Sequence, residues 1–180
     1  MCQNLSDCQD ASMISIGTRD NRQVKQLKMI ENYRVRRAKI NDLPHVLSFI
    51  AQEAVESERR VADLSKLETG ISTALNNESI EIYWILLDQD SQPVGCTAVA
   101  KERSDWNTGY YLWIQSLFIV PELRGHGPQD VILDAVAVDA KAHSCLEIRL
   151  YVHRDNSTAI RSYQKAEFQP SDYPLLSKKL

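Results

Sequence analysis

The sequence lacks the features that identify several large classes of protein. Its 4 cysteines show no paired spacing of the kind that builds a zinc site, and no apolar run is long enough to cross a bilayer. The 21 Lys and Arg residues are outnumbered by 24 Asp and Glu residues. A nucleic-acid-binding surface needs a clustered basic face, which the net charge of -3 argues against. We therefore expect a cytoplasmic protein with reduced thiols that binds neither membrane nor nucleic acid.

What is present describes one ordinary globular domain. The 180 residues are 43% apolar and 25% charged, and a chain of this length buries a substantial core. Residues 1–30 are polar, lack sustained hydrophobic periodicity and show neither the basic nor the apolar region of an export signal. We expect them to form a poorly ordered extension that precedes a domain over residues 31–180.

Hydrophobic periodicity predicts an alternation of strands and helices in this domain. A strand over 33–38 is followed by a helix with Pro44 in its first turn and by a second helix over 63–75. Strands over 80–87 and 93–100 enclose a hairpin loop. The remaining elements are a strand over 110–120, a helix over 131–142, a strand over 146–152, a helix after Asn156 and a final strand near 175–179.

The segment that follows the 110–120 strand carries the strongest chemical signal. It is a short loop that contains Arg124, Gly125, His126 and Gly127 and leads into a helix. Glycine at positions 125 and 127 lets the main chain turn tightly and approach a bound anion, and His126 contributes its backbone more than its ring. The N–H groups of such a loop and the positive end of the helix dipole form a phosphate site, to which Arg124 adds a positive charge.

This loop is not the P-loop of a nucleotide hydrolase, because it lacks a Gly-Lys-Ser or Gly-Lys-Thr ending, and it lacks the third glycine of a dinucleotide fingerprint. It resembles the acyl-CoA pyrophosphate loop of the GCN5-related N-acetyltransferase (GNAT) superfamily, which has Arg or Gln, two residues, Gly, one residue, and then Gly or Ala. Arg124 and Gly127 occupy the first two of these positions. Gln129 occupies the third and Pro128 precedes it, which departs from the superfamily pattern.

A second part of the resemblance lies downstream. The superfamily has an Asn, an Ala three residues on, a Tyr four residues beyond that, and usually a Gly-Phe pair at the end of the helix. Asn156, Ala159, Tyr163 and Phe168 fit this pattern, with Glu167 in place of the glycine. The resemblance covers roughly residues 33–180. Within the superfamily, the chain resembles a bacterial branch of small acetyltransferases that share two elements, Ser104-Asp105-Trp106 and Trp113-Ile114-Gln115-Ser116.

The resemblance implies a single α/β domain of the GNAT acyl-CoA N-acyltransferase fold, with a mixed, mostly antiparallel sheet flanked by helices. The fourth and fifth strands of this fold splay apart, so that an edge of the fourth strand offers main-chain groups to the extended pantetheine arm. The acyl donor acetyl-CoA is then expected to contact this edge, the loop and the last helix, at Leu117, Phe118, Ile119, Arg124, Gly125, His126, Gly127, Gln129, Asn156 and Tyr163.

Tyr163 is the candidate general acid. The superfamily often has a Tyr at this position, and a phenol of pKa about 10 suits the protonation of a leaving thiolate. The alternative is a half-buried aromatic side chain that only packs. Glu102 and Asp105, near the loop between the third and fourth strands, are candidates for the general base or for attracting a cationic substrate, unless they are only solvated charges. Gln115 cannot act as a base, but it is a candidate for holding a water molecule or orienting the substrate.

Together these residues predict an N-acetyltransferase that moves an acetyl group from acetyl-CoA to a primary amine of a small molecule or peptide by direct attack. Cys96 and Cys145 have no neighbouring His in the sequence, so no covalent acyl-enzyme is expected. Trp106 and Trp113 are either packing residues or walls of the acceptor pocket. Two alternatives stay open, a CoA-binding sensor or interaction module without catalysis and an α/β protein unrelated to CoA. A homodimer also stays open.

We predict that residues 1–30 are dispensable for the fold, because a docked element needs a periodic apolar face. A chain that begins at Met29 is expected to melt within a few degrees of the full chain, as measured by circular dichroism. A large drop in melting temperature would show that the extension packs on the domain or across a dimer.

Overall fold

The computed structural model describes residues 32–178, and the extension expected over residues 1–30 lies outside this range. Its centre is a five-stranded sheet in the order β1-β2-β3-β4-β5. Neighbouring strands from β1 to β4 run antiparallel, and β5 pairs parallel to β4. The strands are β1 (Arg34–Arg37), β2 (Ile82–Leu87), β3 (Pro93–Arg103), β4 (Tyr110–Ile119) and β5 (Glu147–Leu150).

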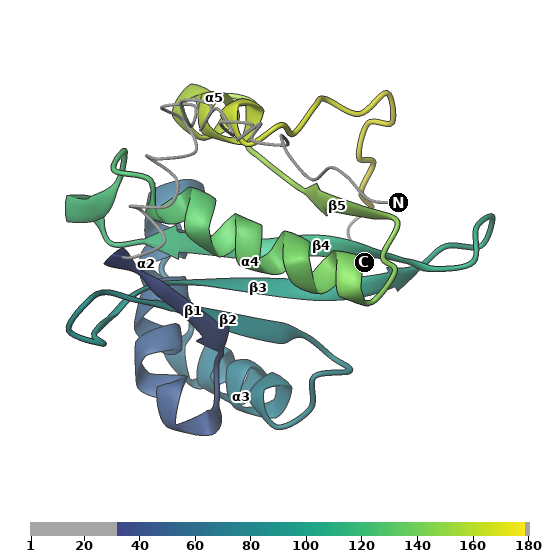
Figure 1. The fold of residues 1–180 in the computed structure, drawn as a ribbon. Coiled ribbons are helices and arrows are strands. Elements are labelled where there is room, and N and C mark those ends of the chain that lie inside the picture. The colour runs from purple at the N-terminus through teal and green to yellow at the C-terminus, as the bar shows by residue number, and fades with distance from the viewer. Residues whose placement is uncertain (1–31, 179–180) are drawn as a thin grey trace, which may run out of the picture.

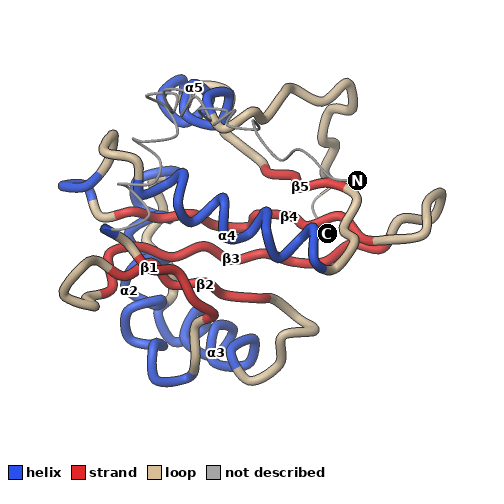
Figure 2. The backbone as a smooth tube through the Cα atoms, viewed as in Figure 1, coloured by secondary structure: helices blue, strands red, loops and turns tan. Residues whose placement is uncertain are grey.

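Helices flank both faces of the sheet, which confirms the predicted α/β fold class. α4 lies across one face, α2 and α3 cover the other, and α5 lies beyond β5 (Figures 1 and 2). Within residues 32–178, no helix is long and apolar enough to cross a bilayer. The helices are α2 (Leu43–Glu58), α3 (Leu64–Leu75), α4 (Pro128–Ala142) and α5 (Ser157–Lys165), with short 3-10 turns η1 (Ile40–Asp42) and η2 (Pro121–Leu123).

Side chains of β2 alternate between two hydrophobic cores, because successive residues of a strand point to opposite faces of the sheet. Trp84 and Leu86 pack in the core beneath α4. Tyr83 and Ile85 pack in the core beneath α2 and α3. Both faces of the sheet are covered here, and β2 is therefore almost wholly buried.

The starts of the helices follow from their capping residues. Asp63 precedes α3 and accepts a hydrogen bond from Lys66 N at 3.3 Å. Asn156 precedes α5 and accepts one from Ala159 N at 3.1 Å. α4 begins at Pro128, earlier than the predicted start at residue 131, because proline suits the first turn of a helix, where an N–H group has no helical partner.

β4 and β5 separate, as predicted. β5 pairs only with the stretch from Tyr111 to Ile114, whereas β4 continues to Ile119. Figure 1 shows β5 turning away from β4 toward α5. Opposite β3 the register shifts between Ile114 and Ser116, so that Gln115 is the extra residue of a β-bulge at the point of separation.

The final strand predicted near residues 175–179 is wrong for the part of it that the structure describes. Residues 175–178 form no strand, and Leu175 and Leu176 are 68% and 89% exposed. The segment follows Pro174 and pairs with no described strand. A strand without a neighbour leaves its main-chain groups to water and gains nothing from its apolar side chains.

Asp42, at the start of α2, connects this helix to β1. Its carboxylate accepts hydrogen bonds from Arg36 Nη1 at 2.7 Å, from Arg36 Nη2 at 2.9 Å and from Lys39 N at 2.7 Å. The hydrogen bonding from Arg36 is the main cause that lowers the pKa of Asp42, so the folded chain binds this proton more weakly than the unfolded chain.

We predict that Asp42→Asn lowers the free energy of unfolding by about 1–2 kcal/mol at pH 7, a modest value because Arg36 is partly exposed. The contribution is present above the unfolded pKa of about 4 and is lost as the pH falls through the lower folded pKa. The difference between parent and variant should therefore shrink in acid. Urea unfolding of parent and variant, at pH 7 and in acid, measures this difference in the free energy of unfolding. Asp90→Asn in the exposed β2–β3 turn is the control. A difference independent of pH would contradict the ion pair as its cause.

Candidate functional site

Beyond the point of separation, one edge of β4 is covered by none of the described strands. Val120 N donates to the carbonyl oxygen of Val94 in β3 at 3.0 Å, so the main-chain groups of Val120 face β3. In an antiparallel strand, the main-chain groups of successive residues point alternately to the two edges. The N–H of Leu117 and the C=O of Ile119 therefore face away from β3. This is the edge that was predicted to meet a pantetheine arm.

Two side chains occupy this edge. Leu117 N donates to Glu53 Oε1 at 3.1 Å, and Arg124 Nε donates to Ile119 O at 2.8 Å. Arg124 Nη2 also pairs with Glu56, one turn along α2 from Glu53, at 2.8 Å. Two carboxylates and one guanidinium thus connect α2, the β4 edge and the predicted phosphate loop.

Sequence reasoning missed Glu53. Val46, Phe49 and Glu53 recur at helical spacing on α2, and the first two are buried against the sheet. Phe49 stacks on Phe118 of β4, with ring centroids 5.4 Å apart, and this contact holds α2 against the edge. A carboxylate on the core-facing stripe of a helix is unusual, and it was the signal available in the sequence.

The predicted phosphate loop has the backbone that its glycines permit. Gly125 has a φ of 79° and Gly127 a φ of 95°, in the left-handed region that favours glycine. A Cβ on Gly125 would meet no atom within 4 Å, so this glycine is required by backbone conformation and not by lack of space. Pro128 is buried at the first position of α4, which accommodates one departure from the superfamily pattern.

Several donors in this loop lack an acceptor within residues 32–178. There, the N–H groups of Gly125 and Gly127 make no main-chain hydrogen bond, and Gln129 Nε2 is buried without a hydrogen-bond partner. His126 is exposed. Donors without acceptors are costly when they are buried, and at a helix N-terminus they fit an anion such as a pyrophosphate.

Tyr163 comes from α5. Its ring packs against the core beneath α4 and meets Phe168 edge-on, with ring centroids 5.7 Å apart. Burial, and to a smaller extent the carboxylate of Glu53, raise the pKa of Tyr163 to about 12. The phenol therefore keeps its proton at neutral pH, as a proton donor must. Asn156, which was predicted to contact the acyl donor, is the N-cap of the same helix.

Glu102 and Asp105 lie toward the other end of β4. Glu102 is opposite Tyr111, which precedes Leu117 by about 20 Å along the strand at ~3.3 Å per residue. The carboxylate of Glu102 accepts a hydrogen bond from Trp113 Nε1. Asp105 lies in the loop between β3 and β4. The structure therefore does not bring these two acids to the edge at Leu117.

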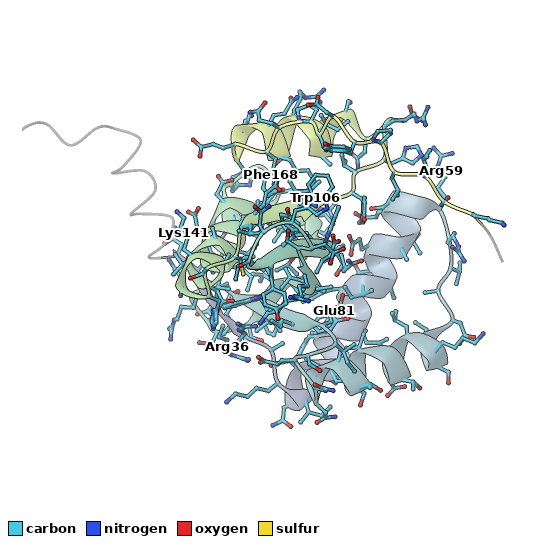
Figure 3. All side chains as sticks on the ribbon, turned by 90° about the vertical axis from the view of Figure 1, so that its right-hand side faces the viewer. Arg36, Arg59, Glu81, Trp106, Lys141 and Phe168 are labelled. Carbon is cyan, nitrogen blue, oxygen red and sulfur yellow. The ribbon has the colours of Figure 1, made fainter. Side chains whose placement is uncertain are left out.

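Aromatic side chains gather at this other end. Trp113 stacks on Tyr151, with ring centroids 4.6 Å apart. Trp106, labelled in Figure 3, is 94% exposed and is not a core residue. Gln115, the bulged residue, is exposed and lies between Trp113 and Leu117 on β4. It is the predicted acceptor-site residue that the structure places next to the open edge.

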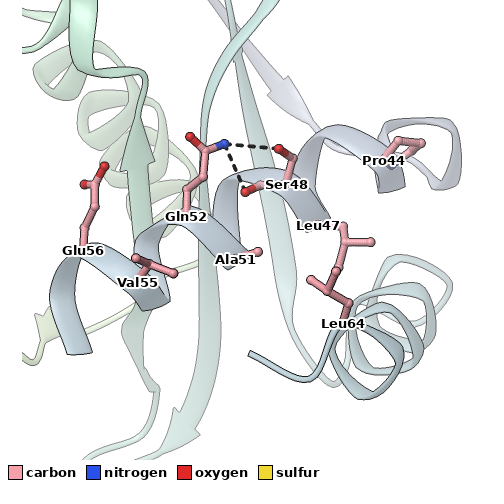
Figure 4. A pocket seen from close by; sticks show the side chains of 8 residues that line it. All are labelled: Pro44, Leu47, Ser48, Ala51, Gln52, Val55, Glu56 and Leu64. Carbon is pink, nitrogen blue, oxygen red and sulfur yellow. Dashed lines mark hydrogen bonds between the residues drawn. The ribbon is translucent and has the colours of Figure 1, made fainter. Parts of the chain in front are cut away.

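A groove on the surface between α2 and α3 is distinct from the β4 edge (Figure 4). Val55 and Leu64 belong to the apolar stripes of these helices, yet they line the groove and are 52% and 57% exposed. Some apolar side chains of these two helices therefore lie outside the core and remain exposed in the groove. The lining residues are mostly apolar: Pro44, Leu47, Ser48, Ala51, Gln52, Val55, Glu56 and Leu64.

Known proteins resemble the chain in sequence and in structure. The family described as "Acetyltransferase (GNAT) family" matches residues 47–168. A possible acetyltransferase from Clostridium difficile 630 is 25% identical, with a TM-score of 0.77 over 83% of this chain and 98% of that one. AAC(6')-Iy, in complex with the bisubstrate analog CoA-S-monomethyl-acetylneamine, is 14% identical, with a TM-score of 0.70 over 82% and 98% of the two chains.

A ribosomal-protein-alanine N-acetyltransferase from Brucella melitensis biovar Abortus 2308 is also similar. It is 12% identical, with a TM-score of 0.66 over 82% of this chain and 99% of that one. At such low identity, this protein and AAC(6')-Iy show a shared fold alone. No protein of curated function matches the sequence.

We predict that Gly127→Val weakens CoA binding by more than about 1 kcal/mol, because a Cβ would crowd the bound phosphate and valine tolerates a positive φ poorly. Isothermal titration with CoA measures the effect. Gly70→Val is the matched control, since Gly70 lies in α3 with open space around its Cβ position. Unchanged affinity in a well-folded Gly127→Val protein would exclude this loop as the phosphate site.

Proposed function

The chain belongs to the acetyltransferase (GNAT) family, and from this premise we propose that it moves an acetyl group from acetyl-CoA to a primary amine of a small molecule or peptide. The observation that carries the proposal is the open edge of β4. None of the described strands covers this edge at Leu117 and Ile119, and it leads to the glycine loop that precedes α4.

The acyl donor is proposed to lie along this edge. An extended pantetheine arm pairs with the main-chain groups of an open edge as a further strand would. Gly125, Gly127 and Gln129 supply the donors for the pyrophosphate at the start of α4. The complex of AAC(6')-Iy with a CoA-containing analog supports the use of CoA by this fold.

Transfer by direct attack fits the chemistry of the buried groups. The Cys96 thiol is wholly buried, and burial raises its pKa well above the usual range, so it remains an unreactive thiol. The amine is then left to attack the thioester carbonyl itself. Tyr163, whose hydroxyl stays protonated at neutral pH, donates the proton to the thiolate that leaves.

The acceptor amine is proposed to approach from the side of Leu117 on which Gln115 and Trp113 lie, toward the start of β4. Glu102 and Asp105 lie on that side and are expected to attract a cationic amine. The names of two proteins with this fold support both kinds of acceptor: one is a ribosomal-protein-alanine N-acetyltransferase, and the analog bound to the other contains acetylneamine, a small molecule.

The alternative is a CoA-binding module without catalysis, which an activity measurement distinguishes from an enzyme. The departures at Pro128 and Gln129 were its basis, yet Pro128 sits where proline suits a helix, and Gln129 brings a donor to the loop. Acetylation of a panel of primary amines by the purified protein is the experiment. Transfer to any amine supports the enzyme, whereas CoA binding without any transfer would support the module.

We predict that Tyr163→Phe slows acetyl transfer by about 10²-fold or more, because it keeps the ring and removes only the proton. CoA affinity and melting temperature should change little. Single-turnover transfer measures the chemical step, with Tyr173→Phe as the control, since Tyr173 is 86% exposed on the C-terminal segment. If the rate stays within about threefold of the parent, water or another group protonates the thiolate and Tyr163 only lines the site.

A further inference from the structure

The proposed reaction needs a proton acceptor as well as a proton donor. An alkylammonium ion of pKa about 10 is neutral in only about one molecule in a thousand at pH 7, and only the neutral amine attacks a thioester. This requirement rests on the proposed acetyl transfer. The acceptor must lie beside the open edge of β4, where the thioester is expected.

Glu53 is a carboxylate that touches this edge. Its Oε1 accepts the hydrogen bond of Leu117 N at 3.1 Å. Leu117 N is one of the main-chain groups that the acyl donor is proposed to meet, so a donor that arrives competes for this N–H. The carboxylate that it displaces then lies next to the thioester, and a carboxylate oxygen can accept a proton from an amine there.

Groups on three other elements are affected by the charge of Glu53. The pKa of Tyr83 on β2, of Cys96 on β3 and of Tyr163 on α5 is raised in each case mainly by burial, and in each case Glu53 adds to the rise. The charge of Glu53 therefore acts on the proposed proton donor, Tyr163, while its carboxylate contacts the β4 edge directly. For Tyr163, Glu53 is the carboxylate that adds to the rise in pKa, whereas Tyr83 also has Glu81 as a hydrogen-bond partner.

The other acids considered for this task are engaged elsewhere or distant. Glu56, one turn along α2, pairs with Arg124 Nη2 at 2.8 Å. Glu102 and Asp105 lie toward the opposite end of β4, about 20 Å along the strand from Leu117 at ~3.3 Å per residue. An acid at that distance can attract a cation, but it cannot take a proton from the attacking nitrogen.

We propose that Glu53 is the general base that accepts the proton of the amine. Its carboxylate takes one proton from the ammonium ion, and the neutral nitrogen forms a C–N bond to the thioester carbonyl carbon. The C–S bond then breaks, and the Tyr163 hydroxyl protonates the sulfur. The second proton that the nitrogen loses returns to Tyr163, while Glu53 releases the first to solvent. The products are an amide, the CoA thiol and one proton.

Glu53→Gln tests this role, because the amide oxygen of Gln can still accept the hydrogen bond of Leu117 N but is not basic. Once an alkylamine acceptor has been found with the parent, turnover of the variant is expected to fall about 10²-fold at pH 7. The gap should close to within about threefold as the pH approaches about 10, where the amine loses its proton unaided. Tyr163, with its pKa of about 12, remains protonated there.

Matched variants separate a chemical role from a structural one. Glu68→Gln on α3, which is exposed, should leave turnover unchanged. Glu53→Asp, which keeps a carboxylate, should be more active than Glu53→Gln at pH 7. CoA affinity by calorimetry should agree within about twofold between parent and Glu53→Gln, since both side chains accept the same hydrogen bond.

Two results would overturn the role of Glu53 while leaving acetyl transfer intact. One is a Glu53→Gln rate within about threefold of the parent at pH 7, and the other is a loss of rate that does not recover at high pH. A parent that binds CoA but acetylates no amine would instead refute the proposed function, and the role of Glu53 with it.

Discussion

The separation of β4 from β5 is the constraint on which the rest of the site depends. Parallel strands that separate leave N–H and C=O groups without a strand partner, and such groups are costly unless something else bonds to them. Here Glu53 bonds to Leu117 N and Arg124 to Ile119 O. The acyl donor is proposed to pair with these same main-chain groups. In that proposal, the open edge that is costly to leave unpaired is also the surface that binds the donor.

α2 connects this edge to the rest of the molecule. Phe49 stacks on Phe118 and sets the separation between helix and strand, and Glu53 and Glu56 follow on the next turns. Burial near Glu53 keeps the Cys96 thiol and the Tyr163 phenol protonated. These surroundings keep the Cys96 thiol unreactive and leave the Tyr163 hydroxyl protonated for its proposed role as proton donor, while α2 brings a carboxylate to the same stretch of β4.

Much of the fold was predictable because its signals are local. Asp63 and Asn156 cap the helices that they precede, and positive φ angles occur at Gly125 and Gly127, where a tight turn was expected. The strand predicted near 175–179 failed because a strand depends on a neighbour as well as on its own residues. Leu175 and Leu176 have suitable side chains, but they pair with no described strand.

The sequence by itself determined the order of the elements, the backbone of the glycine loop before α4 and the place of Tyr163 on its helix. Each of these depends on residues within one or two turns of one another. Only the tertiary structure decided which acid reaches the β4 edge. Glu53 and Leu117 are 64 residues apart in the chain, and Glu56 and Arg124 are 68 apart. Such contacts depend on how a helix packs across a sheet, which no local pattern of residue types encodes.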